Sequence, residues 1–134
     1  MADDEGEIQH KSMKEMRVGS YIMIDTIPCR IVEIETSAPG KHGSAKMRVT
    51  GIGIFDGQKK SLIKPSSADA DVPTITKRKG SVVSVSENSV QIMDSVSYEV
   101  YDLPITEEFQ GKLEAGKEVE ILDAMGRKAL SRVF

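Results

Sequence analysis

One lysine in this 134-residue chain stands where its side chain can do chemistry. It is Lys41, near the centre of the segment 36–46. Pro39 restricts the backbone before it, and Gly40 and Gly43 can take the positive φ that a sharp chain reversal needs. Because apolar-alternating runs flank the segment on both sides, we expect Lys41 at the tip of a hairpin. An ammonium group presented in this way can dock on an anionic partner.

Further positive charge follows Lys41 along the chain. Residues 41–64 contain six lysines and arginines and one acid, Asp56, although the whole chain has a formal net charge of -3. A solvated strand face would explain this strip, but lysine and arginine also bind nucleic-acid phosphates without reading sequence. A second basic run follows at 77–79. We expect contacts with an RNA backbone at Arg48, Lys59, Lys60, Lys64, Lys77, Arg78 and Lys79.

Motifs for nucleotide, metal and covalent chemistry are incomplete. A phosphate-binding loop needs glycine six positions before its lysine and serine or threonine after it, whereas Glu35 and His42 stand there. The segment 51–56 ends in aspartate where a dinucleotide fingerprint needs glycine. His10, His42 and Cys29 give no metal-ligand set, and the scattered acids give no carboxylate pair. We therefore expect no cofactor, no metal and no enzymatic activity.

The first half of the chain must position Lys41, and its pattern indicates short, bent strands. Apolar residues alternate at 21–24, 27–35, 45–54 and 60–64. The apolar phase slips after Ile31 and again near Gly51, and each slip predicts a bulge or bend. These strands predict an SH3-like barrel whose long hairpin carries Lys41. Two flanking segments are expected to lie outside the barrel, namely a flexible acidic leader at 1–11 and a linker at 65–73.

The second half predicts five strands with one short helix. Strands are expected at 75–85, broken near the basic run, and then at 90–93, 96–101, 119–122 and 128–134. Thr106 and Gly116 are suitable ends for a helix between the third and fourth strands. This order is that of an OB-fold, whose surface often binds oligonucleotides. The expected fold is all-β, with an SH3-like barrel at 12–72 and an OB-fold at 73–134.

Composition also suggests a compartment. Cys29 is the only cysteine, so no internal disulfide can form and a reducing environment is favoured. The N-terminal residues are acidic, and no apolar run approaches membrane-spanning length. We expect a cytoplasmic monomer that does not engage a membrane.

Four segments together resemble the translation initiation factor 5A family, in its archaeal branch. The segment 36–46 resembles the family's modification loop, and 51–57, 71–73 and 90–94 stand where the family has similar segments. The resemblance extends from about Ser12 to Phe134. Bacterial elongation factor P is a related protein that usually has a third domain.

The resemblance implies a function for Lys41. In the family, deoxyhypusine synthase transfers a butylamine group from spermidine to this lysine, and a hydroxylase can complete hypusine in some organisms. The modified factor binds the ribosome beside the peptidyl-tRNA and relieves stalling, notably at consecutive prolines. The resemblance also implies loop contacts with RNA at Pro39, Gly40, His42, Gly43, Ser44 and Lys46.

A general RNA-binding module is the alternative. In that case the OB-fold surface would do the main work and the lysine tip would be incidental. The two hypotheses differ for Lys41→Arg, which keeps the charge but cannot accept the same modification. The alternative predicts little effect, whereas the factor hypothesis predicts loss of translational function with the fold intact.

Overall fold

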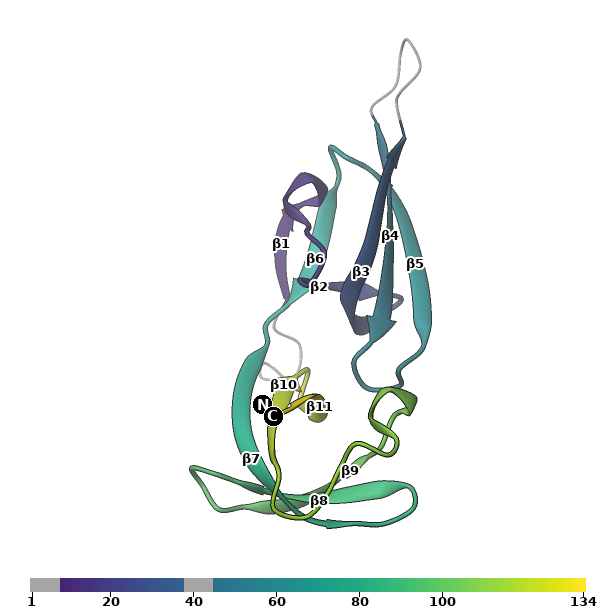
Figure 1. Ribbon diagram of the computed structural model, residues 1–134. Coiled ribbons are helices and arrows are strands. Elements are labelled where there is room, and N and C mark those ends of the chain that lie inside the picture. The colour runs from purple at the N-terminus through teal and green to yellow at the C-terminus, as the bar shows by residue number, and fades with distance from the viewer. Residues whose placement is uncertain (1–7, 38–44) are drawn as a thin grey trace. The chain divides into compact units, whose positions relative to one another are not determined.

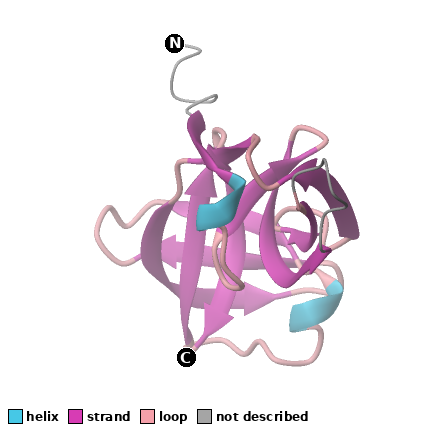
Figure 2. Ribbon diagram, turned by 90° about the horizontal axis from the view of Figure 1, so that it is seen from above, coloured by secondary structure: helices cyan, strands magenta, loops and turns pink. Residues whose placement is uncertain are grey.

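The computed structural model describes residues 8–37 and 45–134 and divides the chain into two compact units, residues 1–74 and 75–134 (Figure 1). Strands dominate both units, and the helical content of the described residues is two short 3-10 turns (Figure 2). The boundary between the units falls after Thr74, whereas the expected boundary lies at residue 73. The predicted all-β class is confirmed, and each unit contains one small, curled sheet.

The first unit is built from a four-stranded antiparallel sheet and a two-stranded ribbon. The sheet has the order β2-β3-β4-β5, and the ribbon pairs β1 with β6. Because β2 also packs against β6 and approaches β5, the sheet curls into a barrel-like form. The elements are β1 (Ile8–Ser12), the 3-10 turn η2 (Met13–Glu15), β2 (Tyr21–Ile24), β3 (Ile27–Ser37), β4 (Lys46–Gly53), β5 (Lys59–Pro65) and β6 (Asp69–Pro73).

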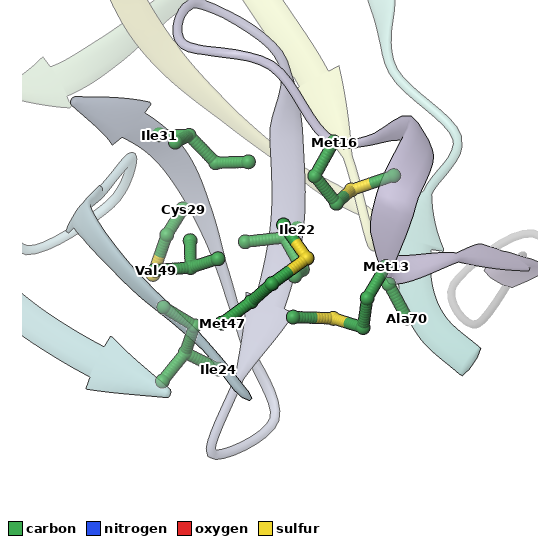
Figure 3. Close-up of a cluster of buried hydrophobic side chains, with 9 residues drawn as sticks. All are labelled: Met13, Met16, Ile22, Ile24, Cys29, Ile31, Met47, Val49 and Ala70. Atoms are coloured by element: carbon green, nitrogen blue, oxygen red, sulfur yellow. The ribbon is translucent and has the colours of Figure 1, made fainter. Parts of the chain in front are cut away.

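Aliphatic and methionine side chains fill the core of this unit. Each element directs its buried face inward, so side chains distant in sequence meet at one centre (Figure 3). Methionine suits such a core because its unbranched side chain fills irregular gaps. The buried residues are Met13, Met16, Ile22, Ile24, Cys29, Ile31, Met47, Val49 and Ala70.

Two expectations for the first unit are revised by the ribbon of β1 and β6. The linker predicted at 65–73 is wrong, because residues 69–73 form β6 and Ala70 is fully buried. Residues 8–11, which were expected in the leader, lie in β1. His10 Nδ1 lies 2.9 Å from Asp71 Oδ1, which links the two strands through their side chains.

The second unit is one five-stranded antiparallel sheet. Its order is β11-β10-β7-β8-β9, and the outer strands β9 and β11 approach one another, so the sheet curls toward closure. Its core combines branched aliphatic residues with Phe109. The elements are β7 (Thr76–Val85), β8 (Ser89–Asp94), β9 (Val100–Pro104), the 3-10 turn η3 (Glu107–Phe109), β10 (Glu118–Ala124) and β11 (Arg127–Val133).

Three local predictions for this unit are wrong. The helix expected at 106–116 is only the turn η3, because Gly111 has φ +76 and the Thr106 side chain makes no capping bond. The third strand begins at Val100, since residues 95–99 form a turn. The first strand, β7, is continuous through the basic run where a break was expected.

Candidate functional site

The hairpin of β3 and β4 forms the stem on either side of the predicted lysine tip (Figure 1). Its last described pair is Ser37 with Lys46. Met47 and Val49 anchor β4 in the core, and a bulge interrupts the register between Ile31 and Glu33, as the phase slip predicted. The tip residues Pro39, Gly40, Lys41, His42, Gly43 and Ser44 lie outside the described residues.

Strand alternation separates the described cations of the basic strip at 41–64 into two groups. Residues paired across neighbouring strands point to the same face of the sheet. Lys64 pairs with Met47, and Lys60 pairs with Gly51, so both lie on the core side. The other three cations lie on the outer face, on which all three are exposed: Lys46, Arg48 and Lys59.

The two core-side lysines have partners within the unit. Lys60 Nζ lies 3.4 Å from Asp56 Oδ2, and its side chain is only 19% exposed. Lys64 Nζ donates to the carbonyl oxygen of Asp69 at 2.9 Å. These contacts favour a structural contribution from both lysines. An RNA contact by either would have to compete with its internal partner.

A shallow groove of about 450 Å³ lies on the outer face of the stem. Glu35, Arg48 and Ile63 form one cross-strand row, and Ile63 is 61% exposed. Sequence reasoning missed this groove because it combines three strands, although the alternation of β5 already indicated an outward Ile63. The lining residues are Glu35, Thr36, Ser37, Lys46, Arg48 and Ile63.

The basic run of the second unit is also divided by strand alternation. Gly80 and Val82 are buried on the core side of β7, and Arg78 shares their face. Lys77 and Lys79 therefore point to the opposite, outer face. The structure thus separates three cations that are consecutive in sequence.

Arg78 is held by two carboxylates. Its Nε donates to Asp123 Oδ2 at 3.2 Å, and its Nη1 lies 3.6 Å from Asp94 Oδ2. Lys128 joins the cluster, with Nζ 3.8 Å from Asp123 Oδ2. This network comes from four strands and favours an intramolecular role for Arg78.

Two groups of this cluster have shifted pKa values: Asp94, and Tyr101, whose ring centroid lies 5.3 Å from Lys128 Nζ. Hydrogen bonds from the backbone N–H groups of Ser97 and Val96, with help from Arg78, lower the pKa of Asp94. Burial, followed by the charge of Asp94, raises the pKa of Tyr101. The hydroxyl of Tyr101 is buried and has no hydrogen-bond partner within the described part of the chain.

Groups suited to metal or thiol chemistry are not assembled in the described ranges 8–37 and 45–134. These residues contain no cluster of three or more His, Cys, Asp or Glu side chains that could hold a metal ion. Burial raises the pKa of the Cys29 thiol to about 11, which keeps it protonated at neutral pH. Within the same residues, no helix is long and apolar enough to cross a membrane.

Comparison with known proteins gives a consistent result across both units. Residues 8–68 match the family model "Translation initiation factor 5A-like, N-terminal", and residues 74–133 match "Eukaryotic elongation factor 5A hypusine, DNA-binding OB fold". Translation initiation factor 5A of Methanocaldococcus jannaschii is 50% identical over 119 residues, which are 89% of each chain. The corresponding factor of Thermococcus gammatolerans is 45% identical over 132 residues, covering 96% of this chain and 97% of that protein.

Solved structures agree with this result. The structure described as eukaryotic translation initiation factor 5A from Methanococcus jannaschii has a TM-score of 0.80 at 46% identity, with 95% of each chain covered. A translation initiation factor eif-5a family protein from Naegleria fowleri has a TM-score of 0.71 at 30% identity, covering 96% of this chain and 99% of that one.

Proposed function

The chain belongs to the translation initiation factor 5A family and is of the archaeal type, and from this premise we propose that it acts on the ribosome through a modified Lys41. The observation that carries the proposal is the β3–β4 stem. Its last described pair, Ser37 with Lys46, brackets residues 38–45, and Lys41 stands near the middle of that segment in the sequence. The core anchors of the stem support a role as a rigid mount for that segment.

The modification explains why the reactive position must be a lysine. Its primary amine can accept the butylamine group that deoxyhypusine synthase transfers from spermidine. Four methylenes and a nitrogen lengthen the side chain by about 6 Å, because each bond is roughly 1.5 Å long. The original nitrogen becomes a secondary amine and a second amine is added, so two cations replace one. The lengthened side chain can enter a narrow RNA-lined cleft.

The extended side chain then orders a substrate of the ribosome. Charge-assisted hydrogen bonds from its amines hold the acceptor end of the peptidyl-tRNA. Fixing that end in a reactive orientation lowers the entropic part of the barrier to peptide bond formation. The benefit is largest where the nascent chain reacts slowly, as at consecutive prolines. The factor therefore relieves stalling without a catalytic group of its own.

This role also accounts for the expected partners. The chain is the substrate of deoxyhypusine synthase, it requires no cofactor, and it works as a monomer in the cytoplasm. The outward-facing Lys46, Arg48 and Lys59 are suited to contacts with RNA phosphates beside the tip, because they are exposed on one face. Their contribution should be salt-dependent and independent of sequence.

A general RNA-binding protein is the second candidate. The outward-facing Lys77 and Lys79 on the OB-type sheet favour it, because a basic strip there can contact a nucleic-acid backbone. In this case the tip would contribute only charge. The two candidate functions therefore predict different effects for a substitution of Lys41, whereas both predict RNA contacts at the basic residues on the strands.

Mass measurement of the native protein tests the proposal first. The peptide that contains Lys41, isolated from growing native cells, should carry one added butylamine group, and an additional oxygen would identify hypusine. Lys41→Arg should abolish translation through a consecutive-proline reporter while the thermal unfolding midpoint stays unchanged. Lys14→Arg, an exposed lysine of the same unit, is the matched control and should retain full activity.

Two results would contradict the proposal. One is an unmodified Lys41 in growing cells. The other is a Lys41→Arg variant that is as active on the reporter as the wild type, which would favour the general RNA-binding candidate.

A further inference from the structure

The outer face of the second unit presents its C-terminal residue Phe134 at the end of β11. Val119 and Ile121 of β10 and Val133 of β11 pack toward the core. Their sequence neighbours therefore point to the opposite face, since side chains alternate along a strand. Arg132 and Phe134 therefore lie on this outer face, on the side of β11, which pairs with β10, and β10 in turn pairs with β7.

The aromatic ring of Phe134 is held in place and still accessible. Its backbone N–H donates to the carbonyl oxygen of Glu118 at 2.9 Å, which continues the pairing of β11 with β10. Phe134 is 52% exposed to solvent. A residue whose backbone continues the strand pairing keeps its ring in one region of the surface, whereas a frayed residue would not. Half of this large apolar surface is thus available to a ligand.

Two cations lie over the ring in cation–π contacts. Lys79 Nζ lies 5.7 Å from the ring centroid, and Arg132 Cζ lies 5.9 Å from it. They reach the ring from different strands: Lys79 and Arg132 both pair with Glu120, from β7 and β11 respectively. The ring is therefore approached by cations from β7 and β11, the two strands on either side of β10.

An exposed aromatic ring between cations suits an unpaired nucleotide. Every base has a π-face that can stack on an aromatic ring, and the cations can contact the phosphates on either side of the base. An apolar protein surface would match the ring but would leave both cations without a partner. A folded RNA helix would offer phosphates but no accessible base face.

Acidic neighbours limit how much of the binding can come from charge. Glu118 is exposed, and Glu120 lies between the two cations, where its Oε1 accepts from the Ser131 hydroxyl at 3.0 Å. These carboxylates reduce the local positive potential. Stacking must then supply most of the affinity, so the dependence on salt should be weaker than for a purely basic patch.

We propose that Phe134, Lys79 and Arg132 form a stacking site for an unpaired RNA base. The site lies on the first, fourth and fifth strands of the unit. It is therefore separate from the usual ligand surface of an OB-fold, which lies on the second and third strands with the loops after the first and fourth. That the nucleic acid is RNA rests on the proposed ribosomal function, whereas the base-stacking chemistry does not.

A tryptophan substitution makes the site observable. The chain contains no tryptophan, so Phe134→Trp introduces a single fluorescent reporter at the site. Titration of the full-length variant with single-stranded oligouridine at low salt should quench its fluorescence, because a base stacks on the indole. Ala115→Trp is the control, since it places the reporter at an exposed position in the loop between β9 and β10, outside both the named site and the usual OB-fold ligand surface. It should show no saturable quenching.

Affinity measurements test the named residues. Phe134→Leu keeps an apolar side chain but removes the ring, and it should weaken oligouridine binding about 5- to 100-fold. Phe134→Tyr should bind like the wild type. Lys79→Ala and Arg132→Ala should each weaken binding and reduce its salt dependence, whereas Glu120→Gln should strengthen it. Unfolding midpoints within error of the wild type would show that the effects do not come from lost structure.

Three outcomes would overturn the proposal: no quenching of the Phe134→Trp reporter, equal affinity of the Phe134→Leu variant, or equal quenching by polyglutamate, which would indicate a site for acidic peptides. Each experiment uses recombinant protein in which Lys41 is unmodified. Failure here would leave the proposed role of Lys41 intact. Conversely, if Lys41 does not act as proposed, stacking of a base on Phe134 can still be measured.

Discussion

The Asp94 side chain is 3% exposed and orders the turn that follows β8. Its Oδ1 accepts from the backbone N–H groups of Val96 at 2.8 Å and Ser97 at 3.0 Å, while its Oδ2 faces Arg78. Because these donors favour the charged form, they outweigh burial and lower the pKa of the carboxyl. One side chain thus closes a turn and holds an arginine.

The lowered pKa of Asp94 predicts a specific acid sensitivity. Its contribution to the free energy of unfolding is fully present above the ordinary pKa of 3.8 and is lost as the pH falls through the lower value of the folded state. Asp94→Asn should lower stability at pH 7, because the amide keeps one acceptor but turns an N–H group toward Arg78. Urea unfolding of both proteins between pH 2 and pH 7 measures this.

The two unfolding curves should converge at the acid end of that series. The variant has no charge to lose at this position, so its stability should depend less on pH below about 4. Asp102→Asn, at an exposed position on the neighbouring strand, is the control and should follow the wild type. A constant difference between Asp94→Asn and wild type at all pH values would contradict the assignment.

At the scale of elements, the sequence pattern correctly predicted those strands and bends that depend on neighbouring residues in the chain. The β3–β4 hairpin and its bulge follow from apolar alternation and a one-residue phase slip. The helix expected at 106–116 failed for a different reason. Capping residues and acids were present, but Gly111 adopts a left-handed backbone and only Phe109 of that segment is buried. Local signals there were overruled by the backbone at one glycine.

Other elements were missed because they depend on distant pairing. β1 and β6 are short and mostly polar. Each forms a strand because it pairs with the other, although the two lie at opposite ends of the unit's sequence. The same limit applies to the candidate site. Alternation alone could have separated Arg78 from Lys77 and Lys79. The partner carboxylate of Asp123, 45 residues away, could not be found from the sequence.

Gly80 provides a test of packing within β7. The sequence pattern predicted a break in this strand near the basic run, yet Gly80, which directly follows that run, is a point of close approach between β7 and β8. A Cβ atom there would lie 2.7 Å from Ile92 Cγ2 and 3.0 Å from the Met93 carbonyl oxygen. Gly80→Ala should therefore destabilise the second unit by about 1–3 kcal/mol in urea unfolding.

A neighbouring substitution controls for general effects on strand β7. Ser81 points to the outer face, so Ser81→Ala should change the free energy of unfolding by less than about 0.5 kcal/mol. A Gly80→Ala variant as stable as the wild type would mean that β7 and β8 can separate without cost. The close approach would then not explain the glycine.

At the scale of the whole molecule, each unit has a buried cluster of its own among the residues that the structure describes. The buried cluster around Met13 and Ile22 belongs to residues 1–74, and the cluster around Val119 and Ile121 belongs to residues 75–134. Each hydrogen-bonded sheet also stays within one unit. A unit with its own core and closed set of strand pairings has what it needs to fold alone, although units of this size have modest stability.

The isolated second unit should therefore fold and keep its binding site. A fragment of residues 75–134 should unfold cooperatively in urea, with amide resonances of its strands close to those in the full chain. The fragment with Phe134→Trp should bind oligouridine as the full-length variant does, because Phe134, Lys79 and Arg132 all belong to this unit. A fragment without cooperative unfolding would mean that the second core depends on the first unit. A folded fragment that fails to bind would show that base stacking needs residues outside 75–134, and the three named side chains would then be insufficient.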